Sequence, residues 1–274
     1  MYHVTPIMLS PITTLGRIAV GTVEFIGGLG LLFRDAVRMV HPALLSGRGR
    51  RLGWQNLWSQ MVRVGVNSIG IVSLVVFCIG AILSLQMEPI LRQYGAVDKI
   101  ADIIGVAMFR ELGPLVAAIT LTGFAGASIA AELGTMKVSE ELEALEAQAI
   151  SPVRFLVVPR VIATTVMMVC LAIVGDLMGA LGGLVVSSCF FGISPELYVN
   201  TTFAAIVMKD FIGGLVKSAV FGATLSTIAC RLGMGVEGGA EGVGVATTKT
   251  VVYTIVALTF IDLGFTTFFY FVGL

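Results

Sequence analysis

Five long stretches of this chain carry almost no charge, and they restrict its fold more than any other feature of the sequence. Val64–Met87 and Leu112–Ala131 contain no charged residue, and 161–191 contains a single one, Asp176. A helix needs about 20 apolar residues to cross the hydrocarbon core of a bilayer, whereas a strand of a membrane barrel needs about 10. The runs therefore predict an all-α integral membrane protein. The predicted spans are 64–87, 103–131, 161–191, 210–230 and 250–273.

The composition agrees with a membrane protein and argues against several other classes. Hydrophobic residues make up 57% of the 274 residues, which leaves too little polar surface for a soluble fold. The formal net charge is zero, so nothing favours binding to nucleic acid. The four cysteines stand singly in apolar runs, and the two histidines, His3 and His41, precede the first span. We therefore predict no metal site and no catalytic residues.

One glycine-rich run matches a nucleotide-binding motif by its letters alone. GMGVEG at 233–238 fits G-x-G-x-x-G, but it follows a predicted membrane helix and not a strand. The chain also has no G-x-x-x-x-G-K-[ST] loop. We interpret 233–244 as a flexible turn between two spans.

Arginine and lysine are concentrated in three of the segments that flank the spans. Six arginines lie between 34 and 63, three basic residues lie between the second and third spans, and Arg231 and Lys249 flank the last loop. The positive-inside rule places such segments in the cytoplasm. The N-terminus is therefore predicted to be cytoplasmic and the C-terminus to lie on the outer side.

Residues 12–45 form the ambiguous N-terminal element. Ile18–Phe33 is apolar apart from Glu24, but it is short for a membrane span. A sixth span here would move the N-terminus to the outer side while the basic cluster after it stays inside. We favour an amphipathic helix that lies in the cytoplasmic interface of the membrane.

Gly175, Gly179 and Gly183 recur every four residues in the third predicted span. This doubled GxxxG pattern lets two helix backbones come into contact. The pattern fits two arrangements equally well, namely packing within one subunit and an interface between subunits.

The segment SEELEALEAQAI, at 139–150, places four glutamates within seven residues of an otherwise apolar chain. Ser139 is the predicted N-cap, and Leu142 and Leu145 belong to a narrow apolar stripe opposite the acidic face. A solvated loop helix would show the same pattern, but an anionic membrane surface repels so acidic a helix. We therefore predict a cytoplasmic coupling helix that docks on a separate motor subunit. The predicted docking residues are Glu140, Glu141, Leu142, Glu143, Leu145 and Glu146.

Three charged residues, Asp176, Lys217 and Asp262, are predicted to lie near the middle of the bilayer. Each costs about 2.5–3.5 kcal/mol there unless a partner or water compensates. Lys217 can pair with Asp262 or Asp176 and hold spans together, or it can contact a lipid headgroup, and both alternatives stay open. Arg110 and Glu111 lie nearer the outer side, and as neighbours on a helix they point about 100° apart.

Four motifs, in order, resemble those of the MlaE permease family, the membrane subunits of ABC transporters that work with MCE-domain proteins to move lipids. The motifs are RELGPLVAA (110–118), AGASIAAELGTMKVSEELEALEAQAISPVRFLVVPR (125–160), KSAVFG (217–222) and GGAEGVGVATTKTVV (238–252). The resemblance departs at Phe124, where many relatives have arginine.

The resemblance implies a homodimer, with two ATPase subunits docked at 139–150 and a hexameric MCE-domain protein on the outer side. ATP and magnesium would bind to the ATPase, so no cofactor is expected on this chain. Family positions that carry intramembrane charge fall on Lys217 and Asp262. The implied lipid-pocket residues are Tyr94, Arg110 and Glu111.

Together these expectations describe an ATP-driven permease that moves phospholipid or a related lipid between the inner membrane and the outer envelope. The expected location is a bacterial inner membrane, with the C-terminus in the periplasm. One alternative is an ion-coupled secondary transporter of an amphiphile, with Asp176 and Asp262 as ion sites. Such transporters are commonly built from inverted repeats, and the sequence shows no internal symmetry. Another alternative is a membrane scaffold that transports nothing.

Overall fold

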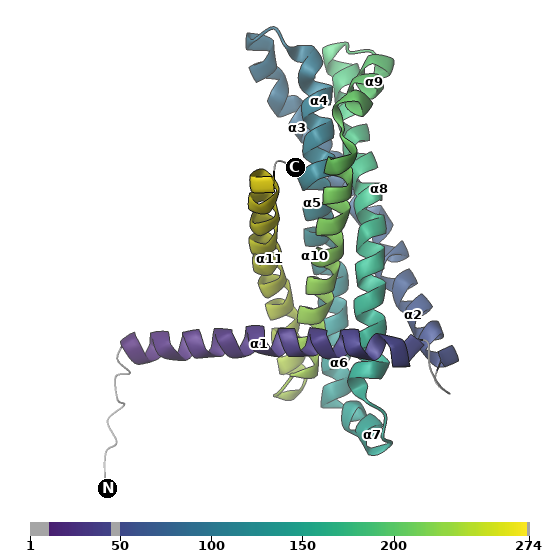
Figure 1. The fold of residues 1–274 in the computed structure, drawn as a ribbon, viewed down its shortest axis with the longest axis vertical. Coiled ribbons are helices and arrows are strands. Elements are labelled where there is room, and N and C mark those ends of the chain that lie inside the picture. The colour runs from purple at the N-terminus through teal and green to yellow at the C-terminus, as the bar shows by residue number, and fades with distance from the viewer. Residues whose placement is uncertain (1–10, 45–49, 273–274) are drawn as a thin grey trace.

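The computed structural model describes residues 11–44 and 50–272, and all regular elements within these ranges are helices (Figure 1). Five helical stretches of the described residues are long and apolar enough to cross a membrane. The prediction of an all-α fold with five spans is therefore confirmed. The stretches are Trp54–Gln93, Val97–Val138, Val153–Phe191, Met208–Met234 and Gly239–Val272.

The first two stretches are each made of several consecutive helices. The first contains most of α2 (Arg50–Val64), the 3-10 turn η1 (Val66–Ser68) and α3 (Ile69–Gln93). The second contains η2 (Val97–Lys99), α4 (Ile100–Ala107), the π-helical turn η3 (Met108–Leu112), α5 (Gly113–Leu121), the π-helical turn η4 (Thr122–Gly126) and α6 (Ala127–Val138).

The rest of the chain continues from α6 to the C-terminal helix. The elements are α7 (Glu141–Ala147), the π-helical turn η5 (Val153–Val157), α8 (Val158–Phe191), α9 (Pro195–Ala205), α10 (Met208–Met234) and α11 (Gly239–Val272). The short helices α7 and α9 lie at opposite ends of the bundle in Figure 1, and we refer to these as the α7 end and the α9 end. The glycine-rich run at 233–238 lies at the turn between α10 and α11, with no strand among the described residues.

Helix α8 is the centre of the bundle and packs most extensively against α3 and α10. Its contact with α3 depends on glycine, because a Cβ atom on Gly80 would lie 1.9 Å from the carbonyl oxygen of Gly179. Such backbone contact is what small residues permit between membrane helices. Of the two arrangements predicted for the glycine pattern, this contact shows packing within one subunit.

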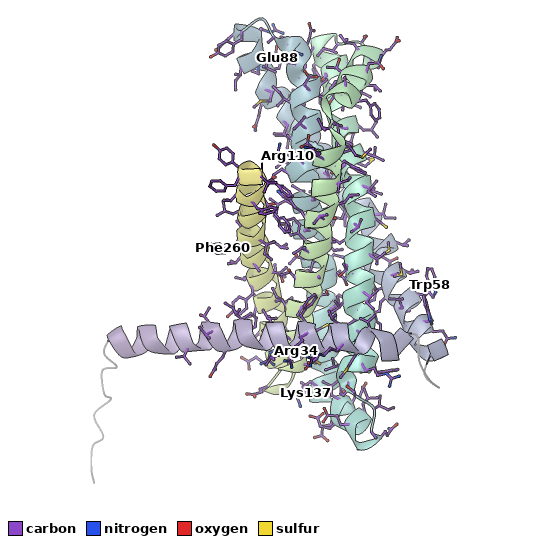
Figure 2. All side chains as sticks on the ribbon, in the orientation of Figure 1. Arg34, Trp58, Glu88, Arg110, Lys137 and Phe260 are labelled. Carbon is purple, nitrogen blue, oxygen red and sulfur yellow. The ribbon has the colours of Figure 1, made fainter. Side chains whose placement is uncertain are left out.

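Helix α1 (Pro11–Leu44) lies across the long helices, toward the α7 end (Figure 1). It is not among the five stretches that could cross a membrane. Phe25 of α1 packs edge-on against Tyr253 of α11, with 5.2 Å between the ring centroids. C-terminal to Tyr253, α11 projects large apolar side chains outward, including Phe260, which is 70% exposed (Figure 2).

Candidate functional site

A cavity of about 230 Å³ lies between α10, α11 and the π-helical turn η3. Its lining is largely apolar, but three charged side chains face it, two basic and one acidic. Nη1 of Arg110 lies 3.5 Å from Oδ1 of Asp210, and Figure 2 shows Arg110 near the C-terminal end of α11. The lining residues are Arg110, Lys209, Asp210, Ile212, Gly213, Val216 and Phe269. The cavity thus combines an apolar wall with a charged rim.

The π-helical turn η3 decides where Arg110 and Glu111 point. Proline lacks an amide hydrogen, so Pro114 leaves a carbonyl of the preceding turn without its helical donor and predicts a bend. In the structure the preceding turn is the wider π-helix Met108–Leu112, with Gly113 as its C-cap, an arrangement common at functional sites. Arg110 is directed to Asp210, whereas Glu111 is directed to Lys217. As expected for adjacent residues of a helix, the two do not pair with each other.

Lys217 of α10 is the centre of a buried polar cluster next to the cavity. Its side chain is 0% exposed, and Nζ lies 2.6 Å from Oε2 of Glu111 and 3.0 Å from Oδ1 of Asp262. Nζ also donates to Oγ1 of Thr266 at 3.0 Å, and the Thr266 hydroxyl donates to Oε1 of Glu111 at 2.9 Å. The ring centroid of Phe269 lies 5.8 Å from Nζ.

The partners of Lys217 account for all three hydrogens of its ammonium group. A buried charge is tolerated when its partners are close and its hydrogen bonds are complete. Of the two partners predicted for Lys217, the structure shows Asp262 and not Asp176, and it adds Glu111. The geometry favours a lysine that holds the spans together over one that contacts a lipid headgroup directly.

Asp176 lies apart from the Lys217 cluster, on α8. It is 1% exposed, and its Oδ1 atom has no hydrogen-bond partner. Its carboxylate rests against the backbone of Gly113, where a Cβ atom would come 1.8 Å from Oδ1. Gly113, the C-cap of the π-helical turn and the first residue of α5, is therefore also a contact point between α5 and α8.

Gly113→Ala is expected to lower the stability of the bundle by about 1–3 kcal/mol, because the new methyl group overpacks the α5–α8 contact. Thermal unfolding of the detergent-purified protein measures the effect. Gly123→Ala in the same span is the matched control, because a Cβ atom there meets nothing within 4 Å. Equal unfolding temperatures for the two variants would contradict the proposed contact.

Tyr94 does not line the cavity, although the resemblance places it in the lipid pocket. It follows α3 at the α9 end and is 79% exposed. Its role stays a prediction. Phe124, which replaces the arginine of many relatives, lies in η4 and is 44% exposed. Of the three residues that the resemblance places in the pocket, only Arg110 lines the cavity. The other lining residues carry no distinctive signal in the sequence, since a lysine at a helix start or one phenylalanine among sixteen does not mark a site. They are Lys209, Asp210, Ile212, Gly213, Val216 and Phe269.

The predicted acidic helix is present as α7, at the end of the molecule that carries α1 (Figure 1). Leu142 is buried and Leu145 half-buried, so the apolar stripe packs onto the bundle. A hydrogen bond from the Lys137 ammonium lowers the pKa of the Glu143 carboxyl. The glutamates that remain exposed are Glu140, Glu141, Glu143 and Glu146. The helix therefore offers an acidic face to solvent.

The predicted start of this helix is wrong. Ser139 does not cap α7, because its hydroxyl donates to the carbonyl of Thr135 at 2.9 Å and closes the last turn of α6. Glu140 takes the cap position instead, in a left-handed conformation with φ of 61°. The prediction failed because a serine hydroxyl can also bond the carbonyl four residues before it in the preceding helix, as Ser139 does here.

No group of three or more His, Cys, Asp or Glu side chains is placed to hold a metal ion within 11–44 and 50–272.

Comparison with known proteins gives one family. The sequence profile described as Permease MlaE matches residues 57–268. A probable ABC transporter permease protein of Rickettsia typhi is 40% identical over 193 residues, which cover 70% of this chain and 74% of that protein.

Two more distant relatives come from photosynthetic organisms. A probable ABC transporter permease protein of Synechocystis is 36% identical over 208 residues, covering 76% of this chain and 79% of the relative. The chloroplastic protein Trigalactosyldiacylglycerol 1 of Arabidopsis thaliana is 32% identical over 220 residues, covering 80% of this chain and 63% of the relative.

Proposed function

The chain belongs to the MlaE permease family, and from this premise we propose that it moves phospholipid or a related lipid between the inner membrane and the outer envelope. Membership makes it a non-catalytic membrane subunit of an ABC transporter. ATP hydrolysis therefore belongs to partner ATPase subunits. The Arabidopsis relative carries the name of a galactolipid, which supports lipid as the class of substrate.

The observation that carries this proposal is the cavity beside η3. It lies within a bundle of membrane-spanning helices and joins apolar side chains to the cations of Arg110 and Lys209. Apolar walls with a few convergent polar groups are typical of ligand sites. A lipid has matching chemistry, because its acyl chains suit the walls and an anionic headgroup suits the two cations.

Arg110→Gln with Lys209→Gln is expected to lower the lipid that co-purifies with the complex by about tenfold, since charge-assisted hydrogen bonds to the headgroup are lost. Glu111 is left intact in this variant, because it holds Lys217. Mass spectrometry of extracted lipid measures the effect. Arg92→Gln with Lys99→Gln removes two exposed cations outside the cavity and is the matched control. Lipid at the wild-type level in the cavity variant would refute the site.

The proposed assembly is a homodimer with two ATPase subunits at the α7 end and an MCE-domain hexamer at the α9 end. The sparse burial of α11 supports a second copy. In α11, 11% of an apolar 18-residue segment is buried, whereas 56% is buried in such a segment of the stretch that contains α8. The proposed location is a bacterial inner membrane, with the N-terminus cytoplasmic and the C-terminus periplasmic. ATP and magnesium would bind to the ATPase subunits, and this chain would bind no cofactor.

The ion-coupled alternative has little support from the geometry. Asp262 is engaged by the Lys217 ammonium, and Asp176 faces the backbone of Gly113 from a position that is 1% exposed. Membership of an ABC permease family favours ATP as the source of energy.

A further inference from the structure

A second ion cluster lies near the α7 end, where Glu132 of α6 binds arginines from two other helices. Its Oε2 atom lies 2.6 Å from Nη1 of Arg63 in α2, and its Oε1 atom lies 3.0 Å from Nη2 of Arg160 in α8. Arg63 also donates to Oγ of Ser128 at 3.0 Å, and Arg160 donates to the carbonyl of Leu156 at 2.9 Å. One carboxylate thus joins three helices.

The position of Glu132 relates this cluster to α7. The α7 segment hangs between α6 and η5, and η5 leads directly into α8. The Glu132–Arg160 pair connects α6 to α8, and the bond from Arg160 to Leu156 extends the connection into η5. A force applied to α7 therefore reaches two helices that are already bonded to each other.

The ion pair between Glu132 and Arg63 brings in a third helix, α2, which is not a neighbour of α7 in the sequence. Helix α2 leads through η1 into α3, so it is the start of the first span. Arg160 is 4% exposed and Arg63 is 45% exposed, so the α8 contact is buried whereas the α2 contact lies at the surface of the bundle. Charge-assisted pairs of this kind are strong where water is excluded.

We propose that Glu132 is a positioning residue that carries movement of α7 into α2 and α8 together, so that the first and third spans respond as one unit to the ATPase. This inference rests on the proposed docking of an ATPase at α7. The Lys217 cluster takes no part in it, because its residues lie on η3, α10 and α11.

The test uses the whole transporter in liposomes and compares lipid moved with ATP hydrolysed. We expect Glu132→Gln to keep the bound ATPase and the rate of ATP hydrolysis, while the lipid moved per ATP falls about tenfold. Arg63→Gln is expected to lower the lipid moved per ATP about threefold. Hydrogen–deuterium exchange of residues 54–64 should respond to ATP and vanadate in the wild type and lose this response in both variants. Lys99→Gln breaks an exposed ion pair of 2.9 Å elsewhere and should change neither readout.

Arg63→Lys, which keeps the charge, should retain most of the coupling. Wild-type lipid per ATP in Glu132→Gln, or an equal loss in Lys99→Gln, would overturn the proposal. Loss of bound ATPase in Glu132→Gln would also overturn it, because the cluster would then support the docking surface itself. Since Arg63 is 45% exposed, Arg63→Gln keeps the test decisive if Glu132→Gln folds poorly. If the ATPase does not dock at α7, it will stay bound after the glutamates of α7 are reversed to lysine. That result is distinct from every outcome of the Glu132 experiment.

Discussion

Reversal of Glu140, Glu143 and Glu146 to lysine is expected to release the ATPase from the permease while the membrane bundle stays folded. All three side chains are exposed on or next to α7, and the buried anchor of this helix, Leu142, is unchanged. Like charges placed across an interface cost several kcal/mol, so the recovered ATPase should fall by at least about tenfold.

Co-purification through a tag on the permease measures this loss, and size-exclusion chromatography reports folding. Asp98→Lys with Glu196→Lys is the matched control, because both residues are exposed and lie at the α9 end. ATPase retained at the normal ratio in the α7 variant would remove α7 from the docking surface. Loss of ATPase in the control variant would mean that net charge, and not the acidic helix, decides binding.

Lys217→Met is expected to be the most destabilising single substitution in the bundle. Removal of the ammonium leaves the carboxylates of Glu111 and Asp262 facing each other without a cation. Breaking a buried ion pair from one side costs about 3–5 kcal/mol, which corresponds to a fall on the order of 10 °C in unfolding temperature. Thermal unfolding in detergent measures it.

Two further variants separate the role of the charge from that of the side chain. Lys217→Met with Glu111→Gln and Asp262→Asn removes all three charges and should recover much of the lost stability. Lys209→Met removes an exposed cation from the same helix and should leave the unfolding temperature nearly unchanged. An unaltered unfolding temperature for Lys217→Met alone would show that the cluster does not stabilise the bundle.

The length and spacing of the apolar runs were sufficient to predict the all-helical fold and the number of spans. These features follow from local physics, since each span must satisfy its own backbone hydrogen bonds in lipid. The acidic segment was likewise recognisable, because four neighbouring glutamates contrast with the rest of the chain.

The polar contacts between helices could not be predicted in the same way. The pairing of Lys217 with Glu111 depends on how α10 and η3 are rotated about their axes, and a π-helical turn changes that rotation. The α-helical period of 3.6 residues does not reveal such turns, since they form where tertiary contacts favour a wider hydrogen-bond ring. The Arg63–Glu132–Arg160 cluster likewise joins residues far apart in the chain.

The crosswise position of α1 has a mechanical consequence for the whole subunit. A helix of 34 residues is about 50 Å long, and in Figure 1 it extends well beyond the bundle on one side. If the long spans tilted, one end of this rod would be driven into hydrocarbon and the other lifted into water. A rod that lies in the membrane interface, as predicted for this helix, would resist such tilting and would hold the cavity beside η3 at a constant depth in the bilayer.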